Sequence, residues 1–157
     1  MKRSASWLIL VALLITASLL TAPRGYAQAR YKVVEVKHLT KADGVNLSAK
    51  TLNDIYDKLR EDLATKGVFG TVVEDGGTIS DADAANAVVL ECKIIKFSKD
   101  SSAIGEVQEE VTLLNRSDHK QIQQFTTVEM PVNIANWEIM ARATGHYLAE
   151  AIRRNLK

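Results

Sequence analysis

Ala87–Phe97 reads AVVLECKIIKF, and this stretch decides the fold. Every second side chain is apolar, whereas the positions between them include the charged Glu91 and Lys93. Alternation with a period of two is typical of a β-strand that has one face in the core. The apolar face consists of Val88, Leu90, Cys92 and Ile94. We therefore predict a central strand with a half-buried character.

Cys92 is the only cysteine in the chain, so no disulfide within the chain can form. Its place on the apolar face of this strand predicts a buried thiol that packs as a small hydrophobic side chain. The alternative is a thiol that pairs between chains, which a single cysteine in an exported protein allows.

Four other stretches predict strands, two before the central strand and two after it. Valine-rich or alternating sequence carries each prediction, and Pro131 is expected to end the last strand because proline cannot donate to a sheet. The predicted strands are Tyr31–Leu39, Val68–Val73, Glu106–Leu114 and Gln121–Met130. The polar Asp81–Asn86 stretch predicts a connector with one helical turn.

Two segments predict amphipathic helices. The first begins after Ser48, whose hydroxyl can cap the helix, and ends before Gly67, which suits a left-handed C-cap. The second runs from Asn133 to Leu156, and Gly145 in its middle is expected to allow close packing on the sheet. Their apolar faces follow the helical period. The first face consists of Leu52, Ile55, Tyr56, Leu59 and Leu63. The second consists of Trp137, Met140, Ala141, Thr144, Tyr147, Leu148, Ala151 and Ile152.

The predicted order is therefore β-α-β-β-β-β-α. Two amphipathic helices need a sheet face to cover, so we predict an α+β, two-layer sandwich. Its mixed sheet has about five strands, and both helices lie on one face. The first strand, helix and second strand are expected to form a parallel crossover.

Residues 1–29 predict a cleaved secretory signal peptide. Lys2 and Arg3 precede an uncharged apolar run from Trp7 to Leu20, and small residues flank a cleavage point between Ala29 and Arg30. The apolar run is shorter than a membrane span, which disfavours an uncleaved anchor. No cysteine lies near the cleavage point to carry a lipid. The mature protein is therefore predicted to be periplasmic or secreted, with no stable membrane anchor.

Residues 30–157 form a single predicted domain, long enough for one hydrophobic core. This part of the chain carries 17 basic and 19 acidic residues. A nucleic-acid-binding protein would show an excess or a cluster of basic residues, so this class is disfavoured.

Candidate metal ligands are sparse. His38, His119 and His146 are the only histidines, and no two have the spacing of ligands on one helix. Asp81–Asn86 reads DADAAN and loosely resembles a calcium loop, but it lacks the glycine and the distal glutamate of an EF-hand. Turn or helix-capping roles explain these residues better, so we predict no metal site and no cofactor.

Candidate catalytic residues are equally weak. Glu106 and Glu110 share a face of a predicted strand, while Glu109 points the other way. A hydrolase with paired carboxylates would need the first two beside a cleft, and a solvated strand face is the expected explanation for the cluster. Cys92 lacks the access and the lowered pKa of a nucleophile. We assign no catalytic residue and predict that the protein is not an enzyme.

Four stretches resemble an uncharacterised bacterial envelope family, the domain of unknown function of the 4410 type. They are Leu63–Phe69 (LATKGVF), Ala82–Leu90 (ADAANAVVL), Val111–Lys120 (VTLLNRSDHK) and the closing helix to Ile152. The chain departs from that pattern at Glu91, where glycine is frequent, and in the shortened Ser98–Gly105 loop. The layout is also similar to small periplasmic accessory domains such as the N-terminal domain of the Tol translocation protein. The resemblance implies a non-catalytic envelope role and transfers no site residues.

Three functions remain open at this point. The leading hypothesis is an accessory module that contacts an envelope protein partner. The alternatives are a carrier of a small apolar or cell-wall-derived ligand and an enzyme that uses the glutamates or Cys92.

Overall fold

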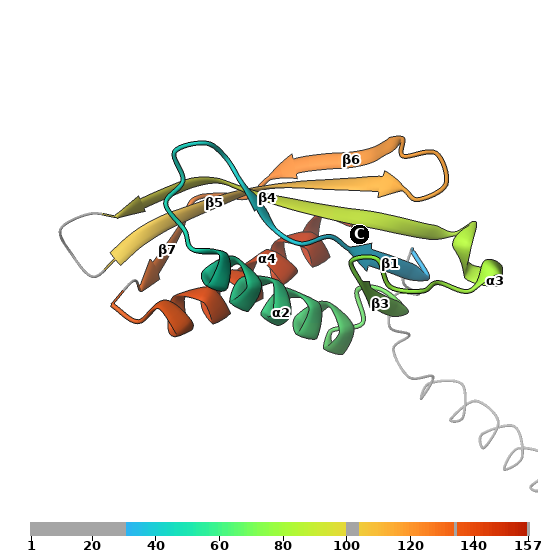
Figure 1. The fold of residues 1–157 in the computed structure, drawn as a ribbon, viewed down its shortest axis with the longest axis horizontal. Helices are drawn as coiled ribbons and strands as arrows, with labels where there is room; N and C mark the ends of the chain where they lie inside the picture. The colour runs from blue at the N-terminus through green and yellow to red at the C-terminus, as the bar shows by residue number, and fades with distance from the viewer. Residues whose placement is uncertain (1–30, 100–103, 134, 157) are drawn as a thin grey trace, which may run out of the picture.

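The computed structural model describes residues 31–99, 104–133 and 135–156. The predicted signal peptide and its cleavage point lie outside these residues. The predicted α+β class with a mixed sheet is confirmed: a long, curled sheet carries its helices beneath it (Figure 1).

The sheet contains seven strands that occupy five positions. Its order is β3-β1-β4-β5-β6, with β2 continuing along β4 after β1, and β7 continuing along β5 after β6. β1 is parallel to both β3 and β4, whereas β5 is antiparallel to β4, β6 and β7. The strands are β1 Val33–Val36, β2 Thr40–Lys41, β3 Thr71–Glu74, β4 Ala87–Lys99, β5 Ile104–Asn115, β6 Gln121–Thr126 and β7 Met130–Asn133.

The central strand β4 matches its prediction and extends it by two residues. Its predicted apolar face is buried, and Cys92 is a free thiol that is 2% exposed. The predicted face of β5 is buried in the same way at Val107, Val111 and Leu113. The parallel β1–β3 pair confirms the predicted parallel connection through the first helix.

The helices are α2 Ala49–Thr65, the single turn α3 Asp81–Ala84, and α4 Trp137–Asn155. The Ser48 cap is confirmed, because its hydroxyl accepts the N–H of Thr51 at 3.1 Å. Gly67 follows α2 with a φ of +63°, as the C-cap prediction requires. α4 starts later than predicted, at an N-cap made by Asn136, because Asn133 belongs to β7.

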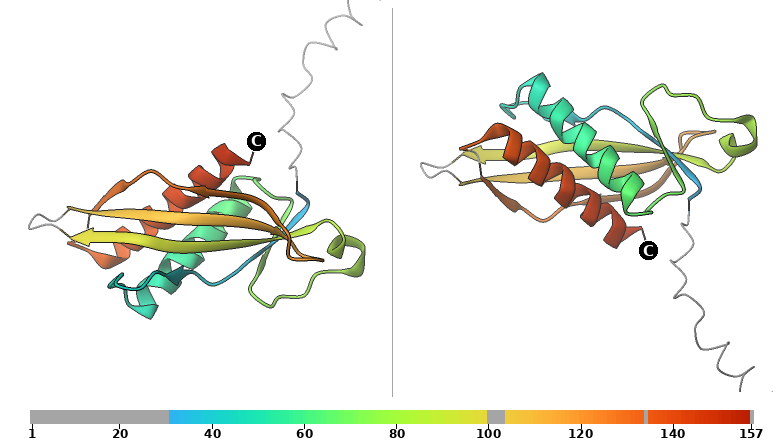
Figure 2. Two further views of the ribbon diagram at one scale, coloured as in Figure 1. Left: turned by 90° about the horizontal axis from the view of Figure 1, so that it is seen from above. Right: turned by 90° about the horizontal axis from the view of Figure 1, so that it is seen from below.

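α2 and α4 lie side by side on the same side of the sheet, α2 toward β1 and α4 toward β6 and β7 (Figure 2). Gly145 makes this close approach possible. A Cβ at this position would lie 2.8 Å from the carbonyl oxygen of Ile55 and 3.0 Å from the amide nitrogen of Leu59. The glycine therefore packs against α2, and the expectation that it packs on the sheet is wrong.

The last predicted strand is also wrong in one respect. Gln121–Met130 is not one strand that Pro131 ends; it breaks at residues 127–129 into β6 and β7, and Pro131 lies inside β7. Among the described strands, β7 pairs only with β5, so its other side is an edge. Proline is tolerated there because an edge strand leaves alternate N–H groups unused.

A cluster of charged side chains around the buried Glu35 lies on the outer face of the sheet near β1. Glu35 is 5% exposed and accepts hydrogen bonds from Lys37 at 2.7 Å, Arg116 at 3.0 Å and the amide of Gly76 at 3.1 Å. Burial opposes its charge, but these bonds outweigh burial and hold the pKa of Glu35 below its ordinary value of 4.5. The cluster joins β1 to the turns that follow β3 and β5.

A second polar cluster joins the two helices. Asp62 of α2 is buried and contacts Lys58 at 2.9 Å and His146 of α4 at 2.7 Å. Lys66 bridges to Glu150 of α4 at 2.6 Å. Hydrogen bonds from Lys66 and from the neighbouring arginine on α4 lower the pKa of Glu150 to about 2.

Candidate functional site

The β6 strand forms an open edge of the sheet. Among the described residues, no strand pairs with β6 on the side away from β5. Thr127 donates its N–H to the carbonyl of Glu109 in β5 at 2.8 Å. Because residues that bond to a given neighbour alternate along an antiparallel strand, every second residue before Thr127 also directs its backbone groups toward β5. The backbone groups of Gln124 and Thr126 consequently point away from the sheet, where another strand could pair with them, whereas a bulge between Gln121 and Gln123 interrupts this alternation.

This edge lacks charge and proline, although a bulge between Gln121 and Gln123 lies near its start. Residues 121–128 read QIQQFTTV and carry no charge and no proline. Edge strands are commonly protected by charged side chains, prolines or bulges. The opposite edge, β3, is only four residues long and ends at Glu74, which faces Arg60 at 3.5 Å. β6 is therefore the less protected of the two edges.

The helix α4 also carries exposed apolar side chains. Ile139 is 56% exposed and Tyr147 is 43% exposed, and the half-buried Ala143 lies between them one turn from each. Tyr147 is opposite the α2-facing Gly145 around the helix, about 200° away. The side-chain amide of Gln123 in β6 donates to the carbonyl oxygen of Asn155 at 3.0 Å, so the end of α4 lies beside this edge, and the stripe lies on the side of α4 away from α2. The prediction that Tyr147 packs in the core is wrong.

We name these side chains together the β6 surface. Its members are apolar or uncharged, and each is exposed. They are Ile122, Gln124, Thr126 and Val128 at the edge, and Ile139 and Tyr147 on α4. Val128 is the most exposed of the apolar members, at 78%.

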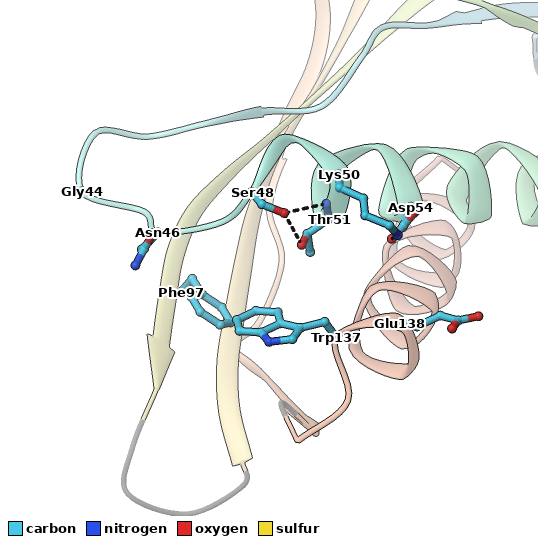
Figure 3. A pocket seen from close by; sticks show the side chains of 9 residues that line it. All are labelled: Gly44, Asn46, Ser48, Lys50, Thr51, Asp54, Phe97, Trp137 and Glu138. Atoms are coloured by element: carbon cyan, nitrogen blue, oxygen red, sulfur yellow. Dashed lines mark hydrogen bonds and ion pairs between the residues drawn. The ribbon is translucent and has the colours of Figure 1, made fainter.

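A pocket of about 630 Å³ opens at the other end of the helix layer (Figure 3). Phe97 of β4 and Trp137 of α4 meet there, with their ring centroids 5.9 Å apart and the rings tilted by 44°. Trp137 is 44% exposed, so the prediction that it packs in the core is wrong as well. We name this cavity the Trp137 pocket.

The polar wall of the Trp137 pocket is formed by the start of α2 and by Glu138. Lys50 pairs with Asp54 at 2.6 Å, and the hydroxyl of Ser48 lies 2.8 Å from that of Thr51 (Figure 3). These side chains satisfy one another, and the described lining contains no histidine or cysteine. The arrangement fits ligand binding better than bond making or bond breaking.

Glu109 contradicts the expectation that the glutamates of β5 form a solvated face. It is fully buried, and its Oε2 accepts a hydrogen bond from the hydroxyl of Thr127, while its Oε1 has no hydrogen-bond partner in the part of the chain that the structure describes. Burial raises the pKa of Glu109 to about 7, although the Thr127 bond partly offsets the effect. The sequence did contain the signal, because Glu109 falls on the same face as the buried Val107 and Val111.

The remaining predicted candidates do not converge. Glu106 and Glu110 lie on the outer face of β5, as predicted. Burial raises the pKa of the Cys92 thiol, which disfavours a nucleophilic thiolate. Asp83 is bound by Ser80 and Lys32, so the Asp81–Asn86 stretch acts as a turn.

The three histidines occupy separate parts of the fold. His38 stacks near Tyr56 with ring centroids 4.4 Å apart, His119 lies in the turn after β5, and His146 binds Asp62. Within the described residues, no group of three or more histidine, cysteine, aspartate or glutamate side chains could hold a metal ion.

Solved structures share this fold. One is protein XCC0632 from Xanthomonas campestris, of the family model DUF330, with 14% sequence identity, 84% of this chain and 86% of that chain covered, and a TM-score of 0.52. Another is PelC from Paraburkholderia phytofirmans, described as a dodecamer, with 14% identity, 82% and 93% covered, and a TM-score of 0.56. No family model matches the chain, and no curated protein is significantly similar to it. The fold is thus shared with an uncharacterised bacterial domain.

Proposed function

We propose that this protein is an exported, non-enzymatic accessory module of the bacterial envelope that acts by contact with another protein. The observation that carries the proposal is the β6 surface, where a sheet edge without charge or proline carries exposed apolar side chains. Strand addition at such an edge supplies main-chain hydrogen bonds, and the side chains beside it supply specificity.

The likeness in fold supports this proposal. PelC is described as a dodecamer, so a chain with this fold can serve as a subunit of an assembly. The resemblance to the 4410-type family remains a prediction, and it also favours a role in the bacterial envelope. α2 and α4 lie on the same side of the sheet (Figure 2), and no strand among the described residues covers the free side of β6.

The proposed location is the periplasm or the medium, after cleavage between Ala29 and Arg30. No helix among the described residues is both long and apolar enough to cross a membrane. Intact-mass measurement of the exported protein tests the cleavage. A mature chain that begins at a residue other than Arg30 would contradict it.

Site-specific photocrosslinking in cells tests the proposed contact. A benzophenone amino acid at Gln124 or Tyr147 is expected to form a discrete adduct with a protein, whereas the same group at Lys93, exposed on the outer face of β4, is expected to form none. Equal labelling at all three positions, or no adduct under several growth conditions, would refute the contact.

The Trp137 pocket favours a second candidate function, a carrier of a small apolar or cell-wall-derived ligand. Its volume falls within the range of ligand sites, and its aromatic pair offers apolar surface beside a polar wall. Trp137 is the only tryptophan after the predicted cleavage point, so its fluorescence reports on this pocket alone.

Fluorescence titration tests this second function. Short N-acetylglucosamine oligomers and a short-chain phospholipid are expected to shift the Trp137 emission if the pocket binds their class. Unchanged emission with both probes, together with no co-purified ligand in native mass spectrometry, would end this alternative.

A further inference from the structure

We propose that the Trp137 pocket binds an uncharged oligosaccharide. The inference rests on the second candidate function, ligand binding in this pocket, and names the chemical class of the ligand. A sugar ring has hydroxyl groups around its edge and C–H groups on its faces. A site for such a ligand needs no net charge, hydrogen-bonding groups on one side and an apolar platform on the other.

The charges around the pocket roughly balance. Asp54 and Glu138 contribute two carboxylates to the lining, and Lys50 contributes one ammonium. α2 and α4 run in the same direction, so both helices begin at this pocket (Figure 3). The N-terminus of a helix carries roughly half a positive charge. The two N-termini and Lys50 together offset the two carboxylates, so the pocket favours neither a cation nor an anion.

The polar wall of the pocket keeps hydrogen-bonding capacity for a ligand. The bond from Nζ of Lys50 to Oδ2 of Asp54 uses one N–H of the ammonium and one oxygen of the carboxylate. Two N–H groups of Lys50 and the second oxygen of Asp54 remain for a ligand. Neighbouring sugar hydroxyls can accept from the ammonium and donate to the carboxylate. Hydrogen bonds of this kind, with one charged member, are stronger than those between neutral groups.

The aromatic pair supplies the apolar platform. Trp137 is 44% exposed, and Phe97 meets it with the ring centroids 5.9 Å apart. Figure 3 shows the indole across from the first turn of α2, so a ligand between them contacts the aromatic side chain on one side and the polar groups on the other. The face of an aromatic ring is negative, so the C–H groups of a sugar, which carry partial positive charge, pack favourably against it.

These features disfavour a purely apolar ligand such as an acyl chain. An acyl chain would cover Lys50 and Asp54 and would replace none of the hydrogen bonds that water makes to them. Removing charged groups from water without new partners is unfavourable. Sugar hydroxyls replace those bonds, so the polar wall stays satisfied when the ligand displaces water.

A matched series of tetramers tests the class of ligand with the purified mature chain. The tetramer of N-acetylglucosamine is uncharged, its deacetylated counterpart has the same rings and linkage but is cationic, and tetragalacturonate is anionic. The uncharged tetramer, titrated to about 10 mM, is expected to shift the Trp137 emission. Each charged tetramer is expected to bind roughly fivefold more weakly or worse, because its charges lose water and meet no net opposite charge. Equal binding of a charged tetramer would overturn the inference.

Calorimetric titration of variants tests whether the sugar occupies this pocket, because the signal does not depend on the indole. Trp137→Ala is expected to weaken binding of the uncharged tetramer by roughly fivefold or more, whereas Tyr147→Ala, at an exposed position outside the lining, is expected to leave it unchanged. Asp54→Asn is expected to weaken binding by roughly threefold or more. Its control is Asp57→Asn, at an exposed position of the same helix outside the lining.

Circular dichroism checks that each variant is folded. Undiminished binding in Trp137→Ala, or a control that loses as much affinity as its matched variant, would overturn the inference.

Two outcomes separate this inference from the function on which it rests. Binding of a short-chain phospholipid that Trp137→Ala abolishes, without binding of the uncharged tetramer, would overturn the sugar and leave the second candidate function standing. Absence of binding by every probe, together with no co-purified ligand in native mass spectrometry, would overturn both.

Discussion

The buried carboxyl of Glu109 makes the stability of this protein depend on pH in a defined window. Its ordinary pKa is 4.5, and burial raises the pKa in the folded state to about 7. Between these values the folded chain holds a proton that the unfolded chain releases. The free energy of unfolding therefore falls as pH rises through this window and levels off above pH 7.

Glu109→Gln removes this effect because the amide carries no charge. The interval from 4.5 to about 7, at about 1.4 kcal/mol per pH unit, corresponds to about 3 kcal/mol. The variant is expected to be more stable than the native protein by up to that amount at pH 8. Near pH 5 the two are expected to agree within about 1 kcal/mol, because a protonated carboxyl and an amide have similar hydrogen-bonding needs.

Urea unfolding at pH 5, 6, 7 and 8 measures the difference between the two proteins. Taking the difference cancels every contribution that the two proteins share, and the carboxyls with lowered pKa, such as Glu35 and Glu150, act only below this window. Glu110→Gln, on the outer face of the same strand, is the control and is expected to keep the native pH dependence. Equal pH dependence in Glu109→Gln and the native protein would refute the reasoning.

Three further outcomes are expected. Glu35→Ala leaves two cations and a backbone amide without their hydrogen-bond acceptor, so it should lower the free energy of unfolding, measured in urea, by roughly 2–4 kcal/mol. The control Glu91→Ala, at an exposed position, should change this free energy by less than about 0.5 kcal/mol. Gly145→Ala should lower it by roughly 1–3 kcal/mol in thermal unfolding, because its Cβ would meet the α2 backbone. Ala143→Gly is the matched helix control and should cost about 1 kcal/mol; a gain in stability for Gly145→Ala, as alanine gives at an open helix position, would contradict the close approach. Cys92 should resist iodoacetamide in the folded protein and react in guanidinium; rapid labelling in buffer would contradict its burial.

The sequence by itself determined the local elements and their inward faces. The alternation in Ala87–Phe97, the Ser48 cap and the glycine at position 67 depend on neighbours within a turn or along one strand. Such short-range patterns are written directly in the chain, so the α+β class and the positions of the two long helices and of the strands β4 and β5 follow from them. The same alternation placed Glu109 on the face of its strand that is opposite to Glu106, although the full burial of Glu109 was not predicted.

Only the tertiary structure decided which segments meet. Trp137 and Tyr147 fall on an apolar helical face, but their exposure depends on where the sheet ends above α4. The uncharged run at residues 121–128 is visible in the sequence, whereas its position at the sheet edge depends on the strand order. Likewise, Gly145 marks a close approach without naming α2 as the neighbour. Contacts between residues far apart in the chain set burial, edges and pockets, and periodicity along the chain carries no information about those contacts.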